Sequence, residues 1–130
     1  MGDGLGILGL SLRAGELAVG DTAVKAAIRD KKARLICTAE DTGARVLTQA
    51  AKSPEWCNGL YVHTHFTQAE LGSALGYTKC GVVAFLDDGL AWSFVHKLAE
   101  GDHVRYGELA DEMQLRKERT LKRRAKKKKG

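Results

Sequence analysis

Apolar residues in this chain follow two alternating patterns, one typical of helices and one typical of buried strands. Val24, Ala27 and Ile28 stand at positions i, i+3 and i+4, which lie on one face of a helix. The continuous apolar run 35–37 follows, with polar residues on both sides, as expected of a short strand that is covered on both faces. Repetition of this unit predicts helices and strands in alternation.

The same patterns assign the chain as far as residue 101. Helices are expected in the segments 1–15, 20–29, 41–51, 67–76 and 87–101, strands in 17–19, 34–38, 60–66 and 82–86, and a loop in 53–59. The candidate helix caps are Asp21, Asp41 or Thr42, Asp87, and the capping-box pair Thr67 and Glu70. Short connections between alternating elements favour an α/β fold, namely a three-layer α/β/α sandwich around a small four-stranded mixed sheet.

The charge of the chain is divided between a mildly acidic body and a basic C-terminal tail. Ten of the 21 Lys and Arg residues lie in 116–129 with one of the 16 acidic residues, a local net charge of +9, and the remainder carries −4. We therefore expect a globular domain over 1–101, a peripheral helix over 102–115, and a Lys/Arg-rich tail over 116–130 that is disordered or a fraying helix. Such a tail suits phosphate groups, because each contact releases a counterion, or it serves as a solubilising extension.

Motifs that carry chemistry in other proteins do not assemble into a consistent site here. The segment 41–44 reads D-T-G-A, as in retroviral-type aspartic proteases, but the helical spacing that follows it favours a helix start. His63 and His65 share a strand face and could hold zinc with Cys57 or Cys80, whereas structural zinc sites use closer Cys/His pairs. We expect neither an enzyme nor a bound cofactor, metal or small-molecule substrate.

The composition also bears on the cellular compartment. No stretch approaches the roughly 20 apolar residues that a membrane span requires. The three cysteines lack the spacing of a disulfide framework. We therefore expect a cytoplasmic protein that does not engage a membrane.

An ordered set of short motifs resembles the L-seven-Ae family of RNA-binding ribosomal proteins, which includes L-thirty-e, and its bacterial L-seven-Ae-like branch most of all. The order and spacing hold from about Leu5 to Leu98. The motifs are Leu8-Gly9-Leu10 with Arg13-Ala14-Gly15, Gly20 before the helix over 24–29, Ala33-Arg34-Leu35-Ile36 before Ala39-Glu40-Asp41, Glu70-Leu71-Gly72 with Ala74-Leu75-Gly76, and Val82-Val83-Ala84.

This resemblance implies a protein that recognises structured, kink-turn-like RNA and is associated with ribosomes or other ribonucleoproteins. The family's contact surface corresponds to 20–26, 39–41 and 77–82 of this chain. Lys25, Arg29 and Lys32, at i, i+4 and i+7, add a basic stripe that could contact phosphates or could be a solvated helix face. The expected RNA-binding residues are Gly20, Asp21, Thr22, Lys25, Arg29, Lys32, Glu40, Lys79, Cys80 and Gly81.

One departure from the family pattern leaves a second function open. Where the family carries Gly-x-Asn-Glu-x-x-Lys, this chain has Thr22, Ala23 and Ala26 at the Asn, Glu and Lys positions. A side chain without hydrogen-bonding groups cannot make the contacts of Glu or Lys. The alternative is a protein-interaction module on the same fold, with non-specific RNA affinity from the tail alone.

Overall fold

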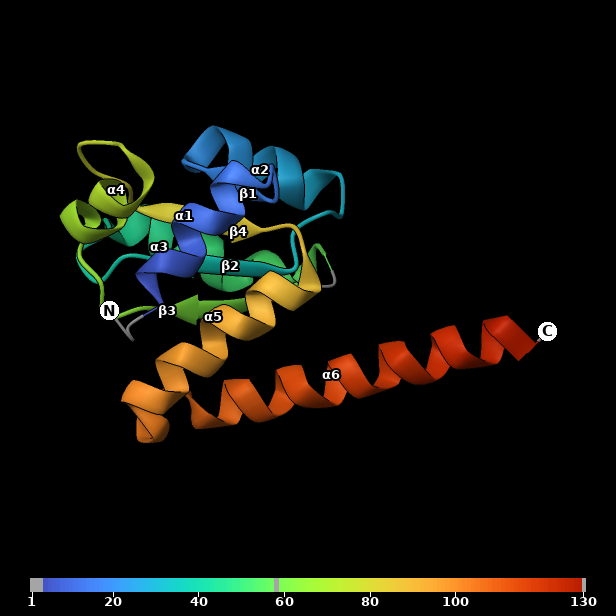
Figure 1. Ribbon diagram of the computed structural model, residues 1–130. Helices are drawn as coiled ribbons and strands as arrows, with labels where there is room; N and C mark the ends of the chain where they lie inside the picture. The colour runs from blue at the N-terminus through green and yellow to red at the C-terminus, as the bar shows by residue number, and fades with distance from the viewer. Residues whose placement is uncertain (1–3, 58, 130) are drawn as a thin grey trace.

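The computed structural model describes residues 4–57 and 59–129, with side chains as far as residue 123. Figure 1 shows a sheet with helices on both faces and a long C-terminal helix that extends beyond the rest of the molecule. The elements are α1 (Leu5–Arg13), β1 (Leu17–Val19), α2 (Asp21–Arg29), β2 (Leu35–Thr38), α3 (Ala44–Lys52), the 3-10 turn η1 (Ser53–Glu55), β3 (Leu60–His63), α4 (Gln68–Leu75), β4 (Val82–Phe85), α5 (Asp88–Gly101) and α6 (His103–Lys129).

The four strands form one mixed sheet in the order β1-β4-β2-β3. β4 is antiparallel to both of its neighbours, and β2 is parallel to β3. The register pairs Val19 with Val83 and Thr38 with Val82. The ends of β1 and β2 therefore lie at the same edge of the sheet as the start of β4.

Successive residues of β2 serve the two faces of the sheet in turn, because side chains alternate along a strand. Leu35 and Cys37 join a core cluster with α1, α4, α5 and the first part of α6. Ile36 joins a smaller cluster with Val24 of α2 and Ala50 of α3. The predicted three-layer α/β/α sandwich around a four-stranded mixed sheet is confirmed.

Two of the predicted helix caps are confirmed and two are wrong. Thr67 and Glu70 form the full capping box, and the Asp87 carboxylate accepts a hydrogen bond from the Leu90 N–H. Asp21 is instead the first residue of α2, whose N-cap is Gly20 with φ +89°. Neither Asp41 nor Thr42 caps α3, which begins after Gly43, because both side chains hold other segments of the chain.

Other boundaries differ from the sequence prediction for local reasons. The segment 53–59 contains η1, because Pro54 lies at the start of that turn, where a missing N–H costs nothing. β3 ends at His63 rather than residue 66, because the next residues turn away to bond with other segments. The Thr64 hydroxyl donates to the Thr38 carbonyl at 2.8 Å, and the His65 N–H donates to the Tyr106 hydroxyl at 2.9 Å.

The helix α6 spans both the expected peripheral helix and the expected tail in one continuous element. Its first turns are fixed to the body, since Tyr106 and Met113 are buried in the larger core cluster. The Arg105 guanidinium donates to the His63 carbonyl at 2.9 Å. The tail therefore continues a helix that is anchored at one end.

Within the described residues, no helix combines the length and the apolar character needed to cross a lipid bilayer.

The buried thiol of Cys37 links stability to alkaline pH. Cys37 is fully buried, and burial raises its pKa well above the usual value because the thiolate loses its hydration. The folded state favours the neutral thiol, and the contribution of this preference to the free energy of unfolding is fully present below about pH 8.5, the pKa of an unfolded cysteine. It is lost as the pH rises through the folded-state pKa. We expect the free energy of unfolding to fall above that pH, by up to about 1.4 kcal/mol per pH unit from this group.

Urea unfolding of the wild type and of Cys37→Ala between pH 7 and 10 measures this effect. The variant should be less stable at neutral pH but should show a shallower loss of stability on the alkaline side. Parallel pH profiles would contradict a role for Cys37 ionisation.

Candidate nucleic-acid interface

Three segments far apart in sequence meet at one edge of the sheet, and we call this surface the loop edge (residues 20–22, 39–42 and 79–82). The Gly20 N–H donates to the Val82 carbonyl at 3.0 Å, and the Ala39 N–H donates to the Gly81 carbonyl at 2.9 Å. These bonds extend the β1–β4 and β2–β4 pairings beyond the strands. The three segments expected to form the contact surface are thus brought together.

Side chains reinforce the loop edge from two directions. The Thr42 hydroxyl donates to the Gly81 carbonyl at 2.8 Å. The Asp41 carboxylate accepts from the Gln68 N–H at 2.8 Å, while the Gln68 side-chain amide donates to the Asp41 carbonyl at 2.9 Å. The Cys80 N–H in turn donates to the Gln68 carbonyl. The start of α4 therefore ties 39–42 to 79–82, and the surface is held in one shape before any ligand arrives.

Gly72 allows the loop before β4 to lie directly on α4. A Cβ atom at this position would stand 2.7 Å from both the backbone N and the Cα of Lys79, and 2.9 Å from the Tyr77 carbonyl oxygen. Backbone atoms cannot rotate away as a side-chain end could. The absence of a side chain at Gly72 thus sets the position of 77–79.

Gly72→Ala should therefore displace this loop. Alanine stabilises a helix by about 1 kcal/mol relative to glycine. We expect the clash of the added Cβ with the backbone of 77–79 to outweigh this gain and to destabilise the protein by about 1–3 kcal/mol. Urea unfolding measures the change, and faster hydrogen exchange of the Cys80 amide reports the loop. Ser73→Ala, at the exposed next position, is the control. Unchanged stability and exchange in Gly72→Ala would contradict the close approach.

The first turn of α2 presents a mixed charge. Asp21 and Lys25, one helical turn apart, form an ion pair at 3.1 Å in which both side chains are about half exposed. Thr22 is exposed beside them. Gly20, the N-cap of α2, has no side chain, and among the described residues no side-chain hydrogen bond from the cap position satisfies the first N–H groups of this helix. An incoming phosphate could accept from these groups but would compete with the Asp21 carboxylate.

The loop edge as a whole is not strongly basic. Glu40 and Lys79 are exposed, and Asp41 is exposed while it holds Gln68. Carboxylates are therefore at least as numerous as ammonium groups on this surface. Recognition here would depend on shape and backbone groups, with net electrostatic attraction supplied from elsewhere on the molecule.

Three of the expected RNA-binding residues do not present side chains at this surface. Cys80 is buried in the larger core cluster, where burial raises its pKa, so it contributes only backbone. Arg29 ends α2, and Lys32 follows the turn after it, where Lys31 has φ +57°. Because the Arg34 N–H bonds the carbonyl of Phe85, the last residue of β4, this turn lies at the opposite edge of the sheet. The basic stripe of Lys25, Arg29 and Lys32 is thus divided between the two edges.

Sequence reasoning missed Thr42 as part of the loop edge and Gln68 as the residue that holds it from α4. Gln68 stands directly after the Thr67 cap, so its place at the start of α4 was predictable. Its bonds to Asp41, 27 residues away, were not, because they arise only from the packing of α4 beside the end of β2.

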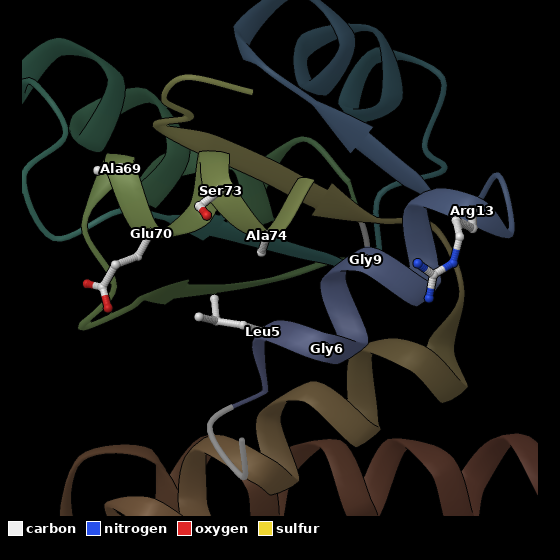
Figure 2. A pocket seen from close by; sticks show the side chains of 8 residues that line it. All are labelled: Leu5, Gly6, Gly9, Arg13, Ala69, Glu70, Ser73 and Ala74. Carbon is white, nitrogen blue, oxygen red and sulfur yellow. The ribbon is translucent and has the colours of Figure 1, made fainter. Parts of the chain in front are cut away.

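Two further hollows flank the body. Between α1 and α4, Gly6, Gly9 and Ser73 help to line a hollow of about 540 Å³ (Figure 2). In this view the Arg13 and Glu70 side chains lie at opposite ends of it. A groove of about 270 Å³ lies between α2 and α3. Its lining mixes apolar side chains with polar ones such as Lys25, Gln49 and Lys52, and includes Trp56, which is 70% exposed.

The two histidines on and after β3 have separate partners. His63 Nδ1 lies 3.0 Å from the Thr38 hydroxyl, and His65 Nδ1 lies 2.8 Å from the Tyr106 hydroxyl. In the part of the chain that the structure describes, no three His, Cys, Asp or Glu side chains are grouped to hold a metal ion. These contacts give both histidines a role in joining strands and α6.

Comparison with known proteins places the fold. No family model and no curated protein matches the chain. The structure is similar to a protein of unknown function from Bacillus halodurans C, with a TM-score of 0.69 and 20% identity over 75% of this chain and 98% of that one. It is also similar to the Giardia lamblia 15.5kD RNA binding protein, with a TM-score of 0.61 and 16% identity over 74% of this chain and 82% of that one. At these identities the similarity establishes the fold.

Proposed function

We propose that this chain is an RNA-binding protein of the L-seven-Ae type that recognises structured, kink-turn-like RNA at its loop edge. The observation that carries the proposal is the assembly of 20–22, 39–42 and 79–82 into one surface by backbone and side-chain hydrogen bonds. They overlap the segments 20–26, 39–41 and 77–82 that the sequence resemblance assigns to RNA. A solved structure of the same fold is described as an RNA binding protein, which supports RNA as the class of ligand.

The mechanism we propose is recognition of shape. A sharply bent RNA exposes phosphates and unstacked bases, which a rigid surface can contact without rearranging. The N–H groups at the start of α2 would donate to a phosphate, and Thr22 would add a hydroxyl beside it. Glu40 and Gly81 would border the same bent segment, with Lys79 adding a positive charge.

We also propose that the protein acts without catalysis, in the cytoplasm, as part of a ribosome or another ribonucleoprotein. Polar groups at the loop edge support the non-catalytic role. The Thr42 hydroxyl and the Asp41 carboxylate both hold neighbouring segments through hydrogen bonds, and Cys80 is a buried thiol with a raised pKa. A nucleophile would need the opposite environment, since a depressed pKa activates a thiol.

A gel-shift comparison tests the proposal directly. The probes are a kink-turn RNA, the same RNA with its G·A pairs disrupted, and a plain duplex. Preference for the intact kink-turn supports the proposal, and equal binding to all three contradicts it. Co-sedimentation with ribosomes tests the association separately.

A charge substitution at the loop edge localises the site. Thr22→Glu places a carboxylate in the first turn of α2. The helix dipole favours a negative charge there, so the helix should be retained, but the carboxylate would repel a bound phosphate. We expect kink-turn affinity to fall by roughly tenfold or more, since like charges in contact cost several kcal/mol. Val104→Glu is the matched control, because Val104 is also the second residue of a helix and is 96% exposed. Equal kink-turn affinities of the two variants would show that the loop edge is not the RNA-binding site.

The groove between α2 and α3 favours a second candidate function, a protein-interaction module. Trp56 is exposed there beside apolar side chains, and exposed aromatic residues are enriched in protein interfaces. The same gel-shift experiment separates the two functions. Absence of RNA binding at low salt would favour the interaction module.

A further inference from the structure

A second groove, of about 660 Å³, lies between α6 and the edge of the sheet opposite the loop edge. One wall includes Arg34, immediately before β2, and the connection from β4 to α5. Its other wall is the middle of α6, including Arg116, Lys117 and Arg123. We call it the α6 groove. Figure 1 shows α6 passing along this side of the body while α2 lies on the far side of the sheet.

Basic side chains dominate the α6 groove. Of the described residues that line it, five are Lys or Arg and two are Asp, a net charge of +3 among them. The Asp87 carboxylate is engaged at 2.9 Å with the Leu90 N–H as the cap of α5. Asp88 faces Arg34 at 3.9 Å, with both side chains substantially exposed. So long and exposed an ion pair is weak, which leaves Arg34 able to exchange Asp88 for a phosphate.

The aromatic side chain in the α6 groove is covered by its own neighbours. The Lys117 ammonium lies 4.0 Å from the centroid of the Trp92 ring, and the His96 ring lies 4.0 Å from it, centroid to centroid. The indole N–H donates to Gln114 at 2.9 Å. Through these contacts Trp92 packs against α6, and they leave little of its ring free to stack on a base. The groove therefore offers charge without a means of reading bases.

We propose that the α6 groove binds the phosphate backbone of an RNA duplex, independently of its base sequence. Single strands are usually held by aromatic stacking as well as charge, whereas double-stranded RNA is recognised through its shape, phosphates and 2′-hydroxyls. Cations on both walls suit the second mode. The proposal rests on RNA as the ligand of the proposed function, but it assigns a separate surface from the loop edge.

The test uses the full-length chain and a fluorescent RNA duplex of about 16 base pairs, the length that small duplex-binding domains span. Fluorescence anisotropy is recorded over a salt series. Arg34→Gln should weaken binding about three- to tenfold and lower the slope of log affinity against log salt by about one. Arg123→Gln should act similarly from the opposite wall.

Lys97→Gln is the matched control. Lys97 lies on α5, pairs with Glu100 at 3.4 Å, and is as exposed as Arg34. The control removes the same charge from a comparable exposed ion pair, so it should leave affinity and slope near those of the wild type. Circular dichroism checks that all three variants are folded.

Equal effects of the Arg34, Arg123 and Lys97 variants would show a diffuse contribution of net charge and overturn the α6 groove. Absence of duplex binding by the wild type would also overturn it. The kink-turn preference measured on the same variants tests the loop edge separately. If Arg34→Gln weakens binding of the duplex while the wild type shows no kink-turn preference, the α6 groove is supported and the proposed kink-turn specificity is contradicted.

Discussion

Tyr106→Ala is expected to destabilise the protein by about 3–5 kcal/mol, the range for removing a large aromatic side chain from a core. Tyr106 is 1% exposed, and its hydroxyl accepts from the His65 N–H and lies 2.8 Å from His65 Nδ1. The substitution therefore opens a cavity and also leaves the His65 amide without its acceptor. Urea unfolding followed by circular dichroism measures the loss.

Two further variants separate these contributions. Tyr106→Phe keeps the ring and removes the hydroxyl, so it should cost about 1–3 kcal/mol. Tyr77→Ala removes a tyrosine that is 53% exposed and should change stability by less than about 0.5 kcal/mol. If Tyr106→Ala were as mild as Tyr77→Ala, α6 would not be docked through this residue in solution.

Truncation after Leu115 is expected to lower affinity for plain duplex RNA by about a hundredfold or more at low salt. The deletion removes ten of the 21 basic residues, and phosphate contacts supply most non-specific binding. The salt slope should fall by several units for the same reason. Anisotropy titration over a salt series measures both quantities.

The truncated protein should remain folded, because Tyr106 and Met113 of the core and Gln114, the partner of Trp92, are retained. If the loop edge reads RNA shape, the ratio of affinities for the intact and disrupted kink-turn RNAs should survive the truncation. Loss of that preference in the truncated protein would indicate that the tail, and not the loop edge, recognises the kink-turn.

Periodicity alone identified the elements whose faces are set by the core. Val24 and Ala27 are buried in the cluster beneath α2, and all four residues of β2 are buried, as their patterns predicted. The capping box at Thr67 was equally readable, since both of its hydrogen bonds are local. Features that depend on three or four adjacent positions were therefore within reach of the sequence.

The Asp21 cap failed locally, because Gly20 is the N-cap of α2, but the other failed predictions mostly concerned contacts made across the fold. Thr42 was assigned to a cap, but its hydroxyl bonds the carbonyl of Gly81, 39 residues away. Helical spacing placed Lys25, Arg29 and Lys32 on one face. The expected helix ended at residue 29, as it does in the structure, but the spacing could not show that the following turn carries Lys32 to the other edge of the sheet. The α6 groove was missed for a similar reason, because Arg34 and Arg123 are brought together only by the return of α6 along the body.

The contact between Arg105 and β3 has a consequence for self-association. Among the described strands, β3 is the outer one and pairs only with β2, and open strand edges invite pairing with other chains. The Leu60 and Thr64 N–H groups point toward the β2 side, so the intervening His63 carbonyl points outward, where Arg105 binds it. The anchored start of α6 thereby occupies part of that edge, and we expect chains in which it detaches to form intermolecular β-sheet aggregates.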